Sequence, residues 1–120
     1  MYKRQAHAHG TEGINAAVRA GVASIDHGSV LSEESIELML ERGTFLVPQA
    51  YLLDKPLPPD TPPATVAKSD YLTPLAERSI RMAYEAEVKM ALGTDAGVFE
   101  HGQNAREFAC LLYTSDAADE

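Results

Sequence analysis

The sequence predicts an α/β fold of parallel β/α units, and three observations support this prediction. Short apolar runs alternate with amphipathic helical patterns, helical patterns stop at Gly21 and Gly43, and three of the runs end in polar residues beside small ones. Strands that alternate with helices pair in parallel through right-handed crossovers. A doubly wound sheet and a (β/α)8 barrel both fit. In a barrel, which takes about 250 residues, the chain would supply roughly four of the eight units.

The apolar runs and the helical patterns give the element order β-α-β-α-β-loop-α-β-α. Strands are expected to end at Ala6-His7 and to span Val22–Asp26, Thr44–Val47 and Lys89–Leu92; helices are expected over Thr11–Ala20, from Ser32 to Arg42, along a stripe from Leu72 to Ala83, and from Asn104 onward. Apolar residues at helical spacing identify each buried face.

The second helix carries the clearest end signals. Ser32 is a predicted N-cap, and Glu33 and Glu34 lie in the first turn, where the helix dipole favours anions. Gly43 follows as the stop. The spacing of Ile36, Met39 and Leu40 predicts that these three side chains are buried, while Glu33, Glu37 and Glu41 face outward.

The stretch Gln49–Ser69 holds five of the seven prolines and is predicted to be a loop. Proline has no N–H and a fixed φ, so a cluster of prolines disfavours regular elements. Thr73 and Pro74 are then a candidate N-cap and first residue of the following helix, although that helix can also begin earlier. A loop of this length in a compact domain is usually functional or mobile, and we expect it to lie over the active face.

The composition excludes several classes of protein. A net charge of -8 argues against nucleic acid as a partner, because phosphate binding needs clustered Lys and Arg. No apolar run reaches the roughly 18 residues that cross a bilayer, and the N-terminus lacks the apolar segment of a signal peptide. One cysteine excludes an internal disulfide framework and fits a reducing compartment. We therefore expect a cytoplasmic protein.

The two ends of the chain differ from the rest. Tyr2–Gln5 and Cys110–Glu120 resemble translated sequencing-adapter read-through, and the second segment loses its apolar periodicity after a helical start. We therefore expect a non-native leader over residues 1–5, a partial barrel domain over residues 6–109 and a non-native tail over residues 110–120. An ordinary frayed C-terminus is the alternative for the tail.

Polar residues at three strand ends indicate a metal site. They lie in the segments AHAHG, IDHG and LGTDAG, which contain His7, His27 and Asp95. The carboxyl ends of parallel strands converge on one face, so these residues are expected to meet there. Two imidazoles and a carboxylate suit Zn²⁺. Each motif alone is weak, since a histidine at a strand end is more often structural, His-X-His occurs by chance, and GTDAG can be a turn.

The segments AHAHG, AGVASIDHG, ERGTFLVPQ, KMALGTDAG and HGQNAREF together resemble the second half of the barrel of the amidohydrolase superfamily. The resemblance covers nearly all of residues 6–109 and is strongest to the branch of imidazolonepropionase and the Xaa-Pro and Xaa-Arg dipeptidases. It implies that His7, His27 and Asp95 belong to strands five, six and eight of a TIM barrel. The His-X-His pair of strand one in that family would lie most of a barrel away from the strand-eight aspartate, so His7 matches strand five better.

The resemblance also implies a mechanism. One or two divalent ions, most typically Zn²⁺, activate a water molecule, and Asp95 passes its proton to the leaving amine. The reaction hydrolyses an amide or cyclic amide of a small-molecule or dipeptide-like substrate. His9, His101 and Asn104 are candidate substrate contacts, although His9 can also be a satisfied structural residue and the other two can be surface residues. The parent protein of this chain is a candidate homo-oligomer.

Two other functions remain open. A deaminase of the same superfamily would use the same ligands, and a metal-binding barrel or scaffold without turnover would keep the fold alone. The His-X-His pair of strand one and the bridging Lys or Glu of strand four, which the resemblance implies, are absent from this chain. We therefore expect that the chain alone is inactive and poorly soluble.

Overall fold

The computed structural model describes residues 3–116, with side chains up to Leu111. In chain order its elements are β1 (Gln5–Ala8), α1 (Thr11–Arg19), β2 (Ser24–His27), α2 (Glu33–Arg42), β3 (Phe45–Val47), α3 (Tyr51–Asp54), α4 (Pro63–Glu85) and α5 (Arg106–Asp116). The predicted leader and tail lie partly outside the described residues, at 1–2 and 117–120, and their boundaries stay predictions.

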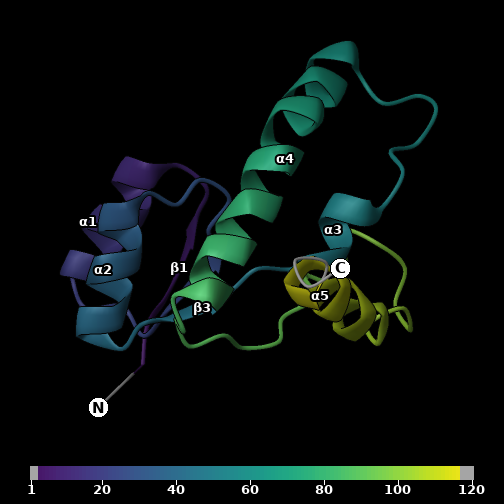
Figure 1. Ribbon diagram of the computed structural model, residues 1–120. Coiled ribbons are helices and arrows are strands. Elements are labelled where there is room, and N and C mark those ends of the chain that lie inside the picture. The colour runs from purple at the N-terminus through teal and green to yellow at the C-terminus, as the bar shows by residue number, and fades with distance from the viewer. Residues whose placement is uncertain (1–2, 117–120) are drawn as a thin grey trace.

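The three strands form one parallel sheet in the order β1-β2-β3. The labels β1 and β3 in Figure 1 mark its two outer strands. Ala8 pairs with His27, and Asp26 pairs with Val47, so the C-terminal ends of the strands lie side by side. The helices α1 and α2 connect successive strands, as parallel pairing requires. The predicted parallel β/α units are confirmed.

The predicted strand over Lys89–Leu92 is reduced to one bridge beside β3. Leu46 donates its amide to the Lys89 carbonyl at 2.8 Å, and the Ala91 amide returns to the Leu46 carbonyl at 2.9 Å, which pairs Leu46 with Met90 in parallel. The segment therefore lies where a fourth strand belongs, but the prediction of a regular strand was wrong. Within the described residues the segment pairs only with β3, and Leu92 at its end is 46% exposed.

The ends of α1 and α2 follow the predicted signals. In α2 the Ser32 hydroxyl accepts from the Ser35 amide while the Ser35 hydroxyl accepts from the Ser32 amide, and Gly43 ends the helix at φ 64°. This reciprocal pair satisfies two of the amides that a helix start leaves free. Ile36 and Met39 are buried as predicted, but Leu40 is 47% exposed, so its predicted burial was wrong.

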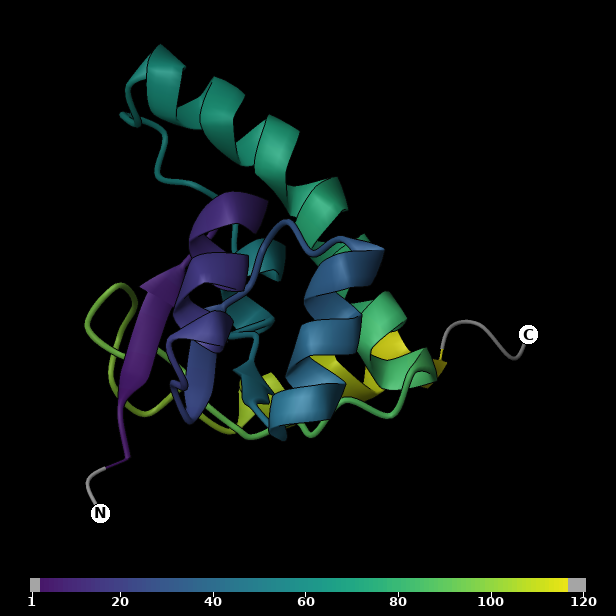
Figure 2. The same ribbon diagram turned by 90° about the vertical axis from the view of Figure 1, so that its left-hand side faces the viewer.

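The hydrophobic core lies between one face of the sheet and the helices. Its members come from α1, β2, α2, β3, α4 and the segments that flank them: Ile14, Val18, Ile25, Leu31, Ile36, Met39, Leu46, Ala83 and Val88. Figure 2 shows α1 and α2 side by side along this face. The opposite face of the sheet opens a hollow of about 920 Å³, lined in part by Ser24, Asp26 and Val47. Successive residues of each strand therefore face the hydrophobic core and the open hollow in alternation.

The prediction of a loop over Gln49–Ser69 holds for residues 55–62, while the two ends of that stretch are helical. α3 begins at Tyr51 and α4 at Pro63, which leaves a loop over residues 55–62. Proline is well tolerated at the start of a helix, where its missing N–H would have no partner. Pro74 lies inside α4, and the buried stripe Ala76, Ser79, Ile80 and Ala83 holds the second half of that helix against the body.

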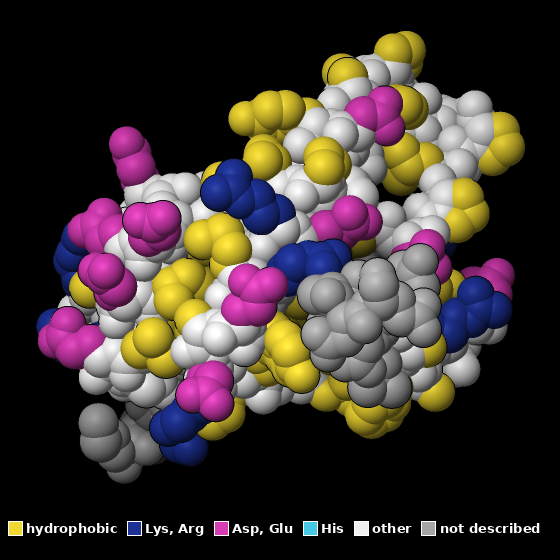
Figure 3. Space-filling view, in the orientation of Figure 1, with side chains coloured by type: hydrophobic (Ala, Val, Ile, Leu, Met, Phe, Trp, Pro, Cys, Tyr) yellow, Lys and Arg dark blue, Asp and Glu magenta, His cyan; other side chains and the backbone are white. Residues whose placement is uncertain are grey.

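The first half of α4 projects from the body of the molecule (Figure 1). Figure 3 shows hydrophobic side chains gathered over this projecting end, and Tyr71 there is 69% exposed. Over the part of the chain that the structure describes, no helix is both long and apolar enough to span a bilayer.

Candidate metal centre

Three histidines form a cluster at the C-terminal ends of β1 and β2. The Nε2 atom of His27 lies 3.0 Å from Nδ1 of His7, and the ring of His9 stacks on the ring of His27 with centroids 4.5 Å apart. One ring nitrogen from each of the three lies within 4.8 Å of the others. Since Ala8 pairs with His27 in the sheet, β1 places His7 and His9 on either side of the residue opposite His27.

The surroundings of the cluster favour the neutral form of two of its rings. Burial lowers the pKa of His9 below its ordinary value, and the neighbouring imidazoles of His27 and His7 lower it further. Burial also lowers the pKa of His27, helped by His7 and opposed by the carboxylate of Asp95. A neutral imidazole keeps a lone pair on one ring nitrogen, which is the form that binds a metal ion.

The nitrogens of His7 and His27 fit a divalent ion. Two ligand atoms at about 2.0–2.1 Å from a tetrahedral zinc ion lie roughly 3.3 Å apart. The observed separation of 3.0 Å is close to that value. These two nitrogens therefore have the donor type of a divalent-metal site and a separation close to that of two ligands of one zinc ion.

The third ring is fixed by a chain of buried hydroxyl groups. Nδ1 of His9 lies 2.8 Å from the hydroxyl of Ser29, the Ser79 hydroxyl donates to the Ser29 carbonyl at 3.0 Å, and the same hydroxyl accepts from the Leu31 amide. Ser29 and Ser79 are both buried. This chain ties His9 to α4 and leaves Nε2 of His9 available to the cluster.

Asp95 lies near the histidines without joining their cluster. Its carboxylate is close enough to oppose the fall in the pKa of His27, and it lines the same hollow as Asp26. Burial raises the pKa of Asp26 above its ordinary value, His7 opposes this rise, and Asp95 adds to it. The structure thus brings three of the predicted residues, His7, His27 and Asp95, to one edge of the sheet.

The backbone is strained at three of these strand ends. His27, Gln49 and Asp95 have φ values of 71°, 48° and 50°, in the left-handed region that non-glycine residues rarely adopt. His27 is the last residue of β2, Gln49 follows β3, and Asp95 follows the bridge at Met90. Such conformations persist where surrounding contacts enforce them, and they concentrate at functional sites.

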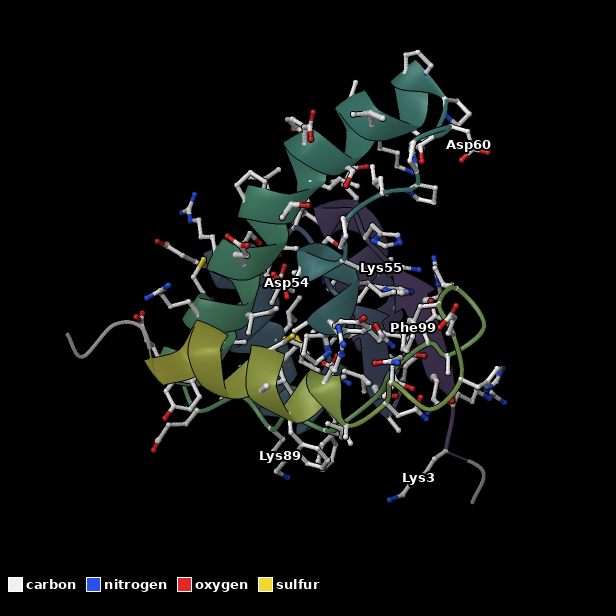
Figure 4. The ribbon with its side chains drawn as sticks, turned by 90° about the vertical axis from the view of Figure 1, so that its right-hand side faces the viewer. Lys3, Asp54, Lys55, Asp60, Lys89 and Phe99 are labelled. Carbon is white, nitrogen blue, oxygen red and sulfur yellow. The ribbon has the colours of Figure 1, made fainter. Side chains whose placement is uncertain are left out.

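The segment after Asp95 is held by α3. Phe99 is buried against Tyr51 with their rings edge to face at 4.9 Å, and Lys55 donates to the Val98 carbonyl at 3.2 Å. Figure 4 shows Lys55 and Phe99 facing one another across this contact. His101 and Asn104 follow on the exposed side of the turn, and within the described residues neither belongs to the histidine cluster.

Sequence reasoning missed three residues at this edge. Asp26 precedes His27 and faces the hollow, Ser29 holds His9, and the side chain of Gln49 accepts the amide of His27 at 2.9 Å. Asp26 has a sequence signal, because it stands at a strand end beside a candidate ligand. Gln49 and Ser29 act through contacts across 22 and 20 residues, for which no local pattern exists.

Residues 3–119 match the amidohydrolase family. An uncharacterized protein of Mycobacterium tuberculosis is 35% identical over 111 residues, which cover 88% of this chain and 30% of that protein. Ochratoxinase of Aspergillus niger is 36% identical over 93 residues, which cover 75% of this chain and 19% of the enzyme. The chain therefore spans less than a third of the length of these relatives.

Solved structures agree with the sequence matches. A Xaa-Pro dipeptidase with bound methionine in its active site superposes with a TM-score of 0.79 at 38% identity, over 92% of this chain and 28% of that one. The crystal structure of A. niger ochratoxinase superposes with a TM-score of 0.82 at 32% identity, over 93% of this chain and 25% of that one. A prolidase structure from Bifidobacterium longum superposes with a TM-score of 0.80 at 30% identity, over 93% of this chain and 31% of that one. The β/α units described above are thus those of amidohydrolase barrels.

Proposed function

Because the chain belongs to the amidohydrolase family, we propose that its parent protein is a metal-dependent hydrolase that cleaves a C–N bond in a small amide or dipeptide. The observation that carries this proposal is the pair of ring nitrogens from His7 and His27, 3.0 Å apart at the strand ends and facing the same edge as Asp95. Active sites of parallel barrels are built at this edge.

We assign His7 and His27 as metal ligands and Asp95 as ligand and proton carrier. A bound divalent ion, with Zn²⁺ the best match to this donor set, supplies an acidified water molecule and polarises the scissile carbonyl. Asp95 is exposed toward the hollow, so its carboxylate can accept a proton and return it to the leaving amine. His9 offers Nε2 beside the pair, while His101 and Asn104 lie on the turn beyond Asp95 and remain candidates for more distant substrate contacts.

The proposed substrate class is inferred from the proteins that this chain resembles. The similar proteins include a Xaa-Pro dipeptidase, prolidases and an ochratoxinase, and one prolidase structure holds N-methylphosphonate-L-proline. Xaa-Pro dipeptides are therefore the first substrates to test with the parent protein, followed by other amides of amino acids.

The decisive experiment compares histidine variants of the parent protein. His27→Ala is expected to remove bound metal, measured by elemental analysis, together with turnover of the dipeptides. His101→Ala is the matched control, because it removes the one histidine outside the cluster, and its metal content should equal that of the wild type. Unchanged metal content in His27→Ala would refute the ligand assignment.

A second variant separates proton transfer from metal binding. Asp95→Asn keeps an oxygen ligand but cannot accept a proton, so we expect kcat to fall by about 10²–10⁴-fold, the usual contribution of a positioned acid–base group. Metal content should fall much less than in His27→Ala. An Asp95→Asn enzyme with near-normal kcat would contradict the assigned role.

A further inference from the structure

We propose that Gln49 is a positioning residue that sets the placement of His27 by completing the sheet with its side chain. The inference rests on the proposed function, since it concerns the same metal site. It assigns to Gln49 no contact with metal or substrate. Its basis is a hydrogen bond from the main chain of a candidate ligand to a buried side-chain amide.

The hydrogen bond replaces a rung of the sheet. Pairing between β2 and β3 ends at Asp26 and Val47, and Pro48 follows. The next amide of β2, that of His27, donates instead to Oε1 of Gln49 at 2.9 Å. On the other side of β2 the Gly28 amide still donates to the Ala8 carbonyl at 3.0 Å. The end of β2 is thus held by main chain on one side and by one side chain on the other.

The bond constrains a residue that is under backbone strain. His27 has a φ of 71°, which costs a residue with a Cβ about 1–2 kcal/mol. Its imidazole direction depends on this backbone conformation, because χ1 is measured from it. An acceptor fixed opposite the His27 amide therefore restricts where Nε2 can lie relative to His7.

Gln49 is well placed to act as a fixed acceptor. It is 6% exposed, and its own carbonyl accepts the Leu52 amide at 3.1 Å. The next two amides, those of Ala50 and Tyr51, donate to the buried carboxylate of Glu107 at 2.7 and 2.9 Å. The backbone that carries Gln49 is therefore clamped from α5.

The same side chain lies against the segment that carries Asp95. A Cβ placed on Gly93 would be 3.4 Å from Nε2 of Gln49 and 2.3 Å from Cγ1 of Val47. Only glycine lets the chain pass so closely over the end of β3. Gln49 consequently lies between His27 on one side and the approach to Asp95 on the other, and its orientation is fixed because Oε1 must face the His27 amide.

The test uses the full chain and Co²⁺, whose visible absorption reports on ligand geometry. Gln49→Met keeps the length of the side chain and removes the acceptor. Gln49→Asn keeps the amide but is one methylene too short, and Gln49→Glu keeps an acceptor oxygen. Gln103→Met is the matched control, since Gln103 follows the Asp95 turn and, within the described residues, is not part of the histidine cluster.

We expect Gln49→Met and Gln49→Asn to weaken Co²⁺ binding by about 10–100-fold, the usual effect of removing a group that orients a ligand. Gln49→Glu should stay much closer to the wild type, and Gln103→Met should equal it. Wild-type affinity and spectrum in both Gln49→Met and Gln49→Asn, with binding lost in His27→Ala, would overturn the role of Gln49 while leaving the ligand assignment intact.

A measurement without metal keeps the two proposals separate. Hydrogen exchange of the His27 amide should accelerate in Gln49→Met and in Gln49→Asn, and the ring nitrogen shifts of His27 should move while those of His101 do not. If the wild-type chain binds no Co²⁺, the ligand assignment fails, and these shifts alone decide the positioning role. Unmoved His27 signals in a folded variant would refute it.

Discussion

At the scale of single residues, Gly28 shows how tightly the end of β2 is packed. It has a φ of 59°, and a Cβ added there would lie 2.4 Å from Cδ1 of Leu46 in the core. The residue that follows His27 must therefore be glycine for two separate reasons, backbone conformation and space. The packing of β3 against this turn fixes the path of the chain just beyond the histidine.

Gly28→Ala should destabilise the chain. The left-handed backbone costs about 1–2 kcal/mol and the contact with Leu46 adds about 1–3 kcal/mol. Urea unfolding measures the loss. Gly13→Ala is the matched control, because Gly13 lies inside α1 with nothing within 4 Å of the added Cβ. It should stabilise the helix by up to about 1 kcal/mol. Equal effects of the two substitutions would show that Gly28 has no special constraint.

At the scale of elements, α5 is joined to α3 through Glu107. This carboxylate is fully buried and accepts the amides of Ala50 and Tyr51, the residues at the start of α3. Burial raises the pKa of Glu107, and its two backbone hydrogen bonds only partly oppose the rise. The short helix α3 is thereby capped from another element, which compensates for its lack of a side-chain cap of its own.

The raised pKa predicts a pH dependence of stability. The folded state holds the Glu107 proton more tightly than the unfolded state, so this contribution is present below the ordinary pKa of 4.5 and is lost as pH rises through the folded pKa. Glu107→Gln removes that dependence. Free energies of unfolding at pH 4 to 8 should show the wild type losing stability relative to Glu107→Gln as pH rises. The exposed Glu100→Gln serves as control, since its stability difference from the wild type should not change with pH. A difference between the wild type and Glu107→Gln that stays constant from pH 4 to 8 would contradict the prediction.

Local chemistry explains which elements could be predicted from the sequence. Ser32 and Gly43 bound α2 through contacts within a few residues, and α1 ends before Gly21 for the same kind of reason. The proline-rich stretch misled because Pro63 sits at a helix start and because buried residues far along α4 hold the helix in place. The position and length of α4 therefore depend on packing between segments that are distant in the sequence.

The candidate site likewise has some residues that could be predicted from the sequence and others that depend on long-range contacts. His7, His27 and Asp95 were predictable because parallel strands bring their C-terminal ends together. The third member of the cluster is His9 and not Asp95. The position of His9 depends on Ser29 and Ser79, which lie far from it in the sequence. The role of Gln49 depends on where β3 stops relative to β2, a register that no local pattern encodes.

At the scale of the whole molecule, one face of the sheet is covered and the other is open. The hollow on the open face is lined by strand residues and by the segment from Ala91 to Asp95, and Phe45 and Leu92 are 38% and 46% exposed there. Over the residues that the structure describes, a site at this edge therefore borders an open hollow. The exclusion of water that strengthens charge interactions in an active site is therefore incomplete.

We accordingly expect the isolated chain to bind Zn²⁺ weakly and to hydrolyse no Xaa-Pro dipeptide. Zinc titration and product analysis of the purified chain measure the two properties, and sedimentation should reveal self-association through the open face. His7→Ala is the control for specific zinc binding. Turnover by the wild-type chain that disappears in Asp95→Ala would contradict this prediction.

The rung between β2 and the side chain of Gln49 has an evolutionary consequence. A main-chain carbonyl is the same whatever residue carries it, so an ordinary hydrogen bond of a sheet survives any substitution other than one to proline. The last hydrogen bond of the sheet beside His27 depends instead on the side chain of one residue, Gln49. Natural variation at position 49 can therefore retune the spacing of the histidines while the register of every strand is inherited unchanged.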